Sequence, residues 1–226
     1  MAYYPVQLDI DGRPCLVVGG GSVGVRKVEG LLACGARVTV VSPELDPVLE
    51  ALAARGRIEA RQRGFSPRDL DGMFLVIGAT DDEAVNRVVS EAAEAKNLLV
   101  NIADQPEKCN FILPSVIRQG DLVVSFSTSG KSPAFARRLR KDLTARFGPE
   151  YALFLEILGA ARKRLLAQEH APEEHKPLFE KLVYGPLLER LGDNDQAGAD
   201  EILLEVLGPD FTVAGLLGRD LAGPGK

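Results

Sequence analysis

The sequence predicts an α/β protein that begins with a parallel sheet and ends in helices. Up to about residue 113, continuous apolar runs alternate with segments of helical period, the pattern of a parallel sheet covered on both faces. Residues 110–130 then hold two strand-like runs with no helix between them, and from residue 150 onward the pattern is helical. We therefore expect a doubly wound α/β domain at 1–113, a segment of strands and one helix at 114–149, and a helical domain at 150–220.

The elements of the first half follow from the spacing of apolar residues. The run MFLVIGAT is apolar throughout and predicts a buried strand, whereas RIEARQR alternates, as a strand near a sheet edge does. Val23, Val28 and Leu31 recur on one face of a predicted helix. The predicted strands are 14–19, 36–42, 57–63, 73–80 and 98–104, and the predicted helices are 22–34, 46–55 and 82–96.

The second half opens with two predicted strands that are separated at Gln119-Gly120-Asp121. A helix is predicted from Pro133 to about Phe147, because Ser132 is a good N-cap and proline suits the first helical position. On this helix, three apolar residues are expected to turn inward: Phe135, Leu139 and Leu143. Further helices are predicted at 150–168, 172–184, 186–191 and 195–207.

Composition argues against several classes of protein. The 226 residues carry a formal net charge of −5, which disfavours general nucleic-acid binding, and no apolar run approaches the ~20 residues that span a bilayer. The first residues lack the pattern of a signal peptide. Three cysteines without CxxC spacing, and two histidines in one charged stretch, indicate neither a disulfide framework nor a metal site. We expect a reduced, cytoplasmic protein that does not enter a membrane.

A glycine motif follows the first predicted strand and opens the first predicted helix. Gly19, Gly21 and Gly24 fit G-x-G-x-x-G, in which one glycine makes the tight turn, one lets the backbone approach a pyrophosphate, and one lets helix and strand pack closely. The helix N-terminus supplies free N–H groups for the anion. This predicts a Rossmann-like dinucleotide site; the alternative is a glycine-rich turn without a ligand.

Other cofactor contacts are expected where strands end. The acid that usually bonds the adenosine ribose is displaced to Glu44, after Ser42 and Pro43, and no arginine follows immediately, which favours NAD over NADP. Thr80 stands at the end of the fourth predicted strand, and Asn101 stands near the end of the fifth. Both are expected at the carboxyl edge, where such sheets bind ligands.

Four blocks of sequence, CLVVGGGSVGVRK, GATDDEAVNRVVSEAAE, VNIADQPEKCNFILPS and FSTSGKSPAFARRLR, resemble the precorrin-2 dehydrogenase family, the dehydrogenase/ferrochelatase module of siroheme synthase. The resemblance covers nearly the whole chain and is weakest after about residue 150. It implies oxidation of precorrin-2 to sirohydrochlorin with NAD, with ferrous iron insertion as a possible second activity that nothing in the chain decides. It also implies a homodimer formed through the central segment. Because the predicted strands within 110–147 have no local partners of the βαβ kind, we expect them to pair across a two-fold axis.

Residue by residue, the resemblance implies that Asp104 is the catalytic carboxylate. Such a base could accept the proton that leaves with hydride transfer, while the alternative is an ordinary turn-forming aspartate. Thr128 stands where some family members carry a phosphorylated serine. The dinucleotide contacts implied are Gly21, Ser22, Val23, Pro43 and Glu44.

Precorrin-2 is a polycarboxylate, so an acidic protein must offer it a local positive surface. Candidate substrate contacts are Ser129, Lys131 and Ser132 in the loop STSGKS, together with Arg137 on the helix that follows. The alternative is a loop, an N-cap and a solvated helix face. Iron would be held only through the macrocycle and Asp104, because an isolated thiol such as Cys109 is more often inert.

Two other classes of function stay open from the residues alone. The chain could be an NAD-sensing module that needs no catalytic carboxylate, or a Rossmann reductase of an unrelated small acid that needs no wide cleft.

Overall fold

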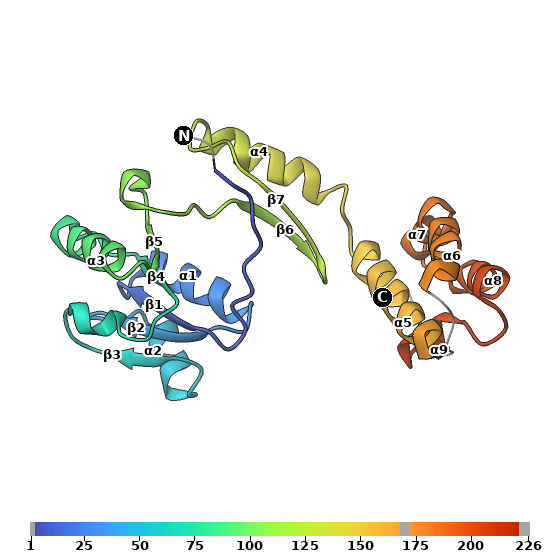
Figure 1. The fold of residues 1–226 in the computed structure, drawn as a ribbon, viewed down its shortest axis with the longest axis horizontal. Helices are drawn as coiled ribbons and strands as arrows, with labels where there is room; N and C mark the ends of the chain where they lie inside the picture. Colours follow the sequence, from blue (N-terminus) through green and yellow to red (C-terminus); the bar gives the residue numbers. More distant parts are fainter. Residues whose placement is uncertain (1–2, 168–171, 222–226) are drawn as a thin grey trace. The chain divides into compact units, whose positions relative to one another are not determined.

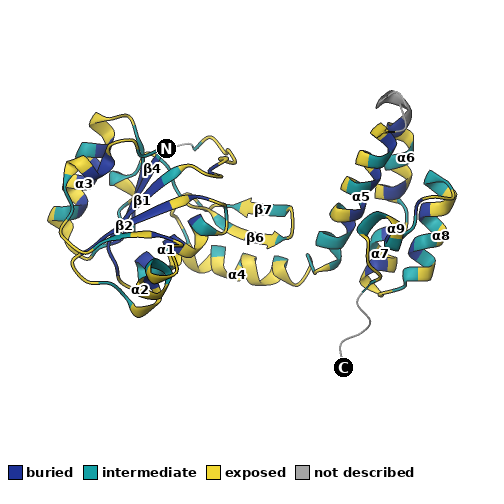
Figure 2. Ribbon diagram, turned by 90° about the horizontal axis from the view of Figure 1, so that it is seen from below, coloured by how far each residue is buried: buried dark blue, intermediate teal, exposed yellow. Residues whose placement is uncertain are grey.

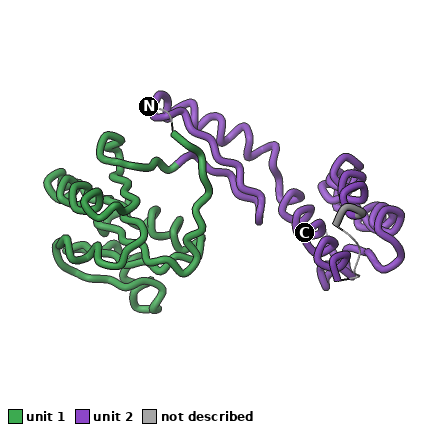
Figure 3. Tube along the Cα trace, in the orientation of Figure 1, with its two compact units in different colours: residues 1–113 green, residues 114–226 purple. Residues whose placement is uncertain are grey.

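The computed structural model describes residues 3–167 and 172–221, without the side chains of 172–174. The chain divides into two compact units, Met1–Leu113 and Pro114–Lys226 (Figure 3). The predicted fold class is confirmed: a parallel sheet with helices on both faces is followed by a small antiparallel sheet and a helical part (Figure 1).

The first unit contains a five-stranded parallel sheet with the order β3-β2-β1-β4-β5. From β1 the chain builds outward first to one side and then, beginning with β4, to the other. In open α/β sheets, ligands bind beside the carboxyl ends of the strands at this point of reversal. The strands are β1 Pro14–Val18, β2 Arg37–Val41, β3 Glu59–Arg61, β4 Leu75–Gly78 and β5 Leu99–Ile102.

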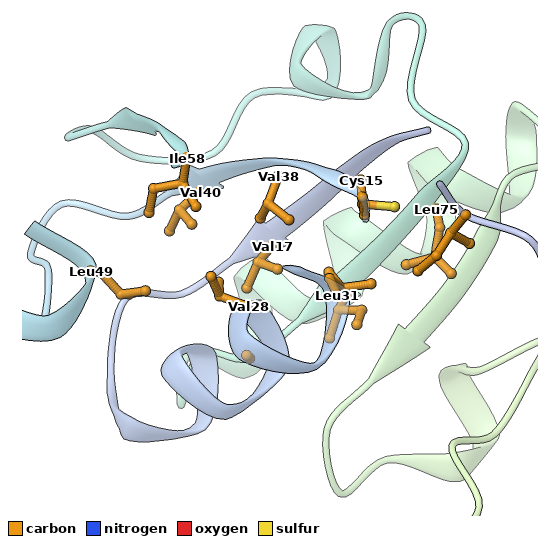
Figure 4. Packing of buried hydrophobic residues seen from close by; sticks show 13 residues of the cluster. Cys15, Val17, Val28, Leu31, Val38, Val40, Leu49, Ile58 and Leu75 are labelled. Carbon is orange, nitrogen blue, oxygen red and sulfur yellow. The ribbon is translucent and has the colours of Figure 1, made fainter. Parts of the chain in front are cut away.

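Apolar residues on both faces of the sheet are buried. Alternate residues of β1 point to opposite sides, so Val17 packs with Val28 of α1 (Ser22–Leu32) in one cluster, shown in Figure 4. Leu16 joins Val89 of α3 (Glu83–Ala95) in the other cluster. Helix α2 (Pro47–Ala54) adds Leu49 to the cluster on the α1 face. This two-sided burial is the physical reason why the strands read as continuous apolar runs.

The predicted edge strand 57–63 is shorter in the structure, where β3 covers only Glu59–Arg61. Beyond it, Arg61 and Arg63 both bond the carboxylate of Asp69, at 2.8 Å and 2.6 Å. The backbone N–H of Ser66 also donates to this carboxylate, at 2.9 Å. Asp69 lies in the short 3-10 helix η1 (Pro67–Leu70) and is 2% exposed, so the loop folds around a buried charge. The two guanidinium groups and the amide hold the pKa of Asp69 well below its usual value.

The second unit begins with a hairpin of β6 (Ser115–Gln119) and β7 (Leu122–Phe126). Gly120 makes the tight turn with a φ of +55°, which glycine adopts readily. Helix α4 (Pro133–Thr144) packs beside β6, and the Ser132 hydroxyl caps it by accepting from the Phe135 amide at 3.2 Å.

Helix α4 does not bury the apolar face that its sequence pattern predicts. None of its residues is buried, Figure 2 shows it mostly exposed, and the Phe135 residue is 55% exposed. The expectation that Phe135 turns inward is therefore wrong for this chain taken alone, while Leu139 and Leu143 are half-buried. The helical period is present, but the described residues leave this side of α4 only partly covered.

The remaining helices form a small bundle with a core of their own. Buried residues from four helices, Phe154, Ile157, Leu182, Leu187 and Leu203, share one cluster. Within the described residues, no helix has the length and hydropathy needed to cross a membrane. The helices are α5 Glu150–Ala167, α6 Pro172–Tyr184, α7 Leu187–Gly192, α8 Gln196–Leu207 and α9 Val213–Leu217, of which α9 was not predicted.

Replacing Asp69 by asparagine is expected to lower the free energy of unfolding by about 2–3 kcal/mol at pH 7, because two arginines lose a buried anionic partner. Since folding lowers the pKa of Asp69, its stabilisation is complete above about pH 4, the usual unfolded value, and declines as the pH falls below it. Urea denaturation followed by circular dichroism should therefore show a gap between wild type and Asp69→Asn that narrows in acid.

The matched control is Asp71→Asn, which breaks an exposed pair with Lys96 and should cost at most about 1 kcal/mol. Equal losses in the two variants, or a gap that widens in acid, would contradict this account of Asp69.

Candidate functional site

Three loops of the first unit meet along the carboxyl edge of the sheet. The Ala79 amide donates to the Val18 carbonyl at 2.7 Å, which ties the loop after β4 to the end of β1. The Ala103 amide donates to the Gly78 carbonyl at 2.8 Å, which ties the loop after β5 to the end of β4. The glycine turn, Thr80 and Asp104 therefore lie along one continuous edge, at the point of reversal.

The glycines of the turn differ in what surrounds them. Gly19 has a φ of +118°, and a Cβ there would collide with the Ala79 carbonyl. A Cβ on Gly24 would collide with the Gly19 carbonyl, so helix α1 is seated directly on the turn. A Cβ on Gly21 would meet nothing within 4 Å. This geometry is what the three predicted roles need: a tight turn, close helix packing, and backbone left open to a ligand.

A fourth glycine, Gly20, was missed by the motif. Its Cβ would collide with the Glu44 carbonyl, and its own carbonyl accepts from the Asp46 amide at 2.8 Å. The loop after β2 is thereby held against the glycine turn. Ser42 is buried there, whereas Pro43 and Glu44 are exposed, and Glu44 makes no ion pair within the described chain. The role of Pro43 and Glu44 at the ribose stays a prediction.

The N-terminus of α1 suits an anion. Its N-cap is Gly21, no side chain caps it, and its first turn contains no acidic residue. The first amides of a helix lack partners inside the helix, so those of Ser22 and Val23 face the open side of the turn. The residues present therefore fit a dinucleotide pyrophosphate, and the assignment of Ser22 and Val23 to it stays a prediction.

Thr80 and Asn101 already hold parts of the edge in place. The Thr80 hydroxyl accepts from the Asp82 amide at 3.2 Å, and its carbonyl accepts from the Asn86 side chain at 2.9 Å. Asn101 is buried, and its side-chain nitrogen donates to the Phe111 carbonyl at 3.0 Å. Both residues thus shape the loops, and their contact with a cofactor stays a prediction.

Asp104 occupies a strained position of an exposed turn. The Gln105 amide donates to the Ile102 carbonyl at 3.3 Å, which closes the turn, and Asp104 has a φ of +60°. Glycine is favoured in this left-handed region; asparagine and aspartate adopt it occasionally, at a cost of roughly 1 kcal/mol relative to glycine. Strain of this kind gathers at functional sites, because the surrounding structure must enforce it.

A cation that the sequence did not single out lies close enough to this turn to interact with Asp104 electrostatically. Lys27 is on α1, half-buried, and makes no ion pair with a described residue. Burial, and secondarily the charge of Arg26, hold the pKa of Lys27 below its usual value, while Asp104 and Cys109 partly offset this. No local pattern could reveal Lys27, because α1 and the turn after β5 meet only in the folded sheet.

The candidate substrate residues belong to the second unit. Ser129 has a φ of +52° and is exposed, as are Lys131 and Arg137, neither of which forms an ion pair within the described chain. Ser132 caps α4, and the Thr128 hydroxyl accepts from the Ser132 amide at 3.2 Å. The loop is therefore ordered by its own hydroxyls and presents cations, but its role with a substrate stays a prediction.

No group of three metal-ligating side chains gathers anywhere in the part of the chain that the structure describes. Burial raises the pKa of Cys15 to about 11, and it also raises that of Cys109, so neither thiol is poised as a thiolate ligand at neutral pH.

Comparison with known proteins identifies both halves of this arrangement. Residues 6–115 match a family model described as putative NAD(P)-binding, and residues 119–146 match one described as sirohaem biosynthesis protein central. The first unit is therefore an NAD(P)-binding domain.

Full-length relatives extend the match over the whole chain. It is 42% identical to the siroheme synthase of Thioalkalivibrio sulfidiphilus, covering 100% of this chain and 47% of that protein. It is 36% identical to siroheme synthase 3 of Aeromonas hydrophila, covering 100% of this chain and 48% of that protein. The chain thus spans slightly less than half the length of these relatives.

A solved structure, SirC, precorrin-2 dehydrogenase, superposes with a TM-score of 0.78 at 27% identity, covering 90% of this chain and 98% of that one.

The glycines provide a test that separates binding from folding. Gly21→Ala should leave the free energy of unfolding within about 0.5 kcal/mol of wild type, because its Cβ enters open space. The same variant should weaken dinucleotide binding at least about tenfold, since the methyl group occupies the approach of the pyrophosphate. Gly24→Ala should instead lose about 1–3 kcal/mol of stability, because its Cβ meets the Gly19 carbonyl.

Calorimetric titration with NAD and urea denaturation measure the two effects. Unchanged NAD affinity in Gly21→Ala would show that the pyrophosphate does not bind at this turn.

Proposed function

The chain belongs to the family of siroheme synthases and precorrin-2 dehydrogenases, and we propose that it oxidises precorrin-2 to sirohydrochlorin with NAD as the oxidant. The observation that carries this proposal is Asp104, held at a φ of +60° on the same sheet edge as the glycine turn of an NAD(P)-binding domain. The relatives support the assignment through their names: siroheme synthases and a precorrin-2 dehydrogenase.

The reaction removes two hydrogens from the macrocycle. NAD, when bound, accepts one of them as hydride. The other leaves as a proton, which needs a base beside the reacting carbon. Asp104 is exposed at the turn after β5, where its carboxylate suits this task.

The substrate class follows from the charges of the second unit. Lys131 and Arg137 are exposed cations without ion-pair partners in the described chain, near the exposed Ser129. Carboxylates bind such groups by charge-assisted hydrogen bonds. These three residues and Ser132 are our candidates for holding the carboxylates of a tetrapyrrole.

NAD is preferred to NADP because the loop after β2 offers an acid and no free cation. Arg61 ends the neighbouring strand and Arg63 follows it, but both are engaged by the buried Asp69. A 2′-phosphate would therefore face Glu44 without a compensating charge.

A homodimer is the assembly that this structure favours. Helix α4 buries none of its residues, and Phe135 and Val116 of the neighbouring strand are exposed at 55% and 39%. Residues 119–146 match the sirohaem central model, so the uncovered surface lies in a family-specific segment. We assign this surface to contact with a second copy of the chain.

Two alternatives raised by the sequence, an NAD-sensing module and a reductase of an unrelated small acid, are not favoured by these relatives.

The activity test mixes the protein with NAD and enzymatically made precorrin-2 and follows the absorbance of sirohydrochlorin. Wild type should turn over, and Asp104→Asn should lose at least about a hundredfold in kcat, because an amide cannot accept the proton. NAD affinity and the unfolding midpoint should stay near the wild-type values, since asparagine tolerates the same backbone conformation. Adding ferrous iron to the product tests whether siroheme also forms.

No spectral change with wild type would overturn the proposed function. Full activity in Asp104→Asn would reject the role of the carboxylate while leaving the function standing.

The assembly is tested by Phe135→Glu in sedimentation velocity at micromolar concentration. Wild type should sediment at twice the mass of the chain, and the variant should shift to the monomer because a charge replaces an interfacial ring. Val48→Glu, at a comparably exposed site on α2, should leave the mass unchanged. A monomeric wild type would contradict the dimer.

A further inference from the structure

We propose that Cys109 is a positioning residue for Asp104: its thiol joins the two ends of the turn that presents the carboxylate. The inference rests on the proposed function of Asp104 as the base. It assigns to Cys109 a role other than the inert thiol or iron contact that its sequence suggests.

The geometry of the thiol is centred on one turn. The Ile102 amide lies 3.1 Å from Cys109 Sγ, and Sγ lies 3.3 Å from the Ile102 carbonyl and 3.2 Å from the Gln105 carbonyl. Ile102 and Gln105 are the first and last residues of the turn, and Asp104 is its third. A single sulfur atom therefore contacts both ends of the turn that holds Asp104 at positive φ.

The protonation state of Cys109 suits this arrangement. Burial raises the pKa of Cys109, and the neighbouring Glu107 adds to the effect, so the thiol keeps its proton at neutral pH. The S–H group can donate to either carbonyl, while the sulfur accepts from the Ile102 amide. A thiolate would instead face two carbonyl oxygens without a donor to offer them.

Cys109 is itself held firmly beside β5. The Asn110 side chain accepts from the Val100 amide at 2.8 Å and donates to the Leu98 carbonyl at 2.7 Å. On the other side of Cys109, the Ser90 hydroxyl donates to the Lys108 carbonyl at 2.9 Å. The thiol thus projects from a segment that is fixed on both sides, which lets it restrain a turn that would otherwise relax.

The size of sulfur matters to the contacts. The three hydrogen bonds between Sγ and the turn are 3.1 to 3.3 Å long, and a fourth, from the Asn101 side chain, is 3.6 Å long. A serine hydroxyl prefers about 2.8 Å and sits on a shorter bond. Serine should therefore restore part of the network, and alanine none of it. With alanine, the buried Ile102 amide also loses its acceptor.

The experiment compares Cys109→Ala and Cys109→Ser in the wild-type and Asp104→Asn backgrounds. In the wild-type background, alanine should lower kcat for precorrin-2 oxidation between about tenfold and a hundredfold through misplacement of the base, with NAD affinity within about twofold of wild type. Serine should recover part of the loss. In the Asp104→Asn background, alanine should change the residual rate by less than about twofold, because the group it positions is already gone.

Cys34→Ala is the matched control, since this cysteine lies beyond the far end of α1 from the glycine turn, and it should keep wild-type kcat. Wild-type kcat in Cys109→Ala would overturn the proposal. An equal loss in both backgrounds would also overturn it, because the effect would then bypass Asp104.

Amide hydrogen exchange separates this proposal from the proposed function. The Ile102 and Gln105 amides should exchange faster in Cys109→Ala than in wild type, whatever reaction the protein catalyses. If wild type fails to oxidise precorrin-2 but this exchange accelerates, the function is wrong and the restraint by Cys109 stands. Unchanged exchange would refute the restraint.

Discussion

Backbone contact at Gly19 is the constraint on which the first unit depends. Its Cα lies against the Ala79 carbonyl on one side, and its own carbonyl lies against Gly24 on the other. Strand β1, helix α1 and the loop after β4 therefore meet without side chains between them. This contact directs the N-terminus of α1 towards the carboxyl edge of the sheet, and β5 then brings Asp104 to the same edge.

The two units bury their apolar residues in different ways. The first covers a sheet on both faces, whereas the terminal helices of the second surround a core of their own. In the second unit, α4 has an amphipathic sequence but no buried residue. A helix with this pattern is stable in water when another surface covers its apolar side, which is why we assign that surface to a second copy of the chain.

Periodicity predicted most of the fold because burial on both faces of a sheet leaves a direct mark on sequence. Periodicity failed to predict burial where the surface that would cover a helix lies far away in the sequence. The pattern around Phe135 correctly indicated a helix, but no helical wheel tells whether its apolar side is covered within one chain. Lys27 escaped notice for a related reason: its electrostatic interaction with Asp104 arises only in the folded domain. Cys109 was considered only as an inert thiol or an iron contact, because its hydrogen bonds to Ile102 and Gln105 form only in the folded turn. The position of Asp104 at a strand end could be predicted, whereas its left-handed backbone could not.

At position 104, the backbone conformation and the proposed reaction favour different residues. The turn would be most relaxed with glycine, but glycine has no carboxylate to offer. A library screened only for resistance to heat should therefore enrich replacements at residue 104 that are well folded and chemically inert. An aspartate at this position is what we expect if the proposed reaction, and not folding, has dictated the residue.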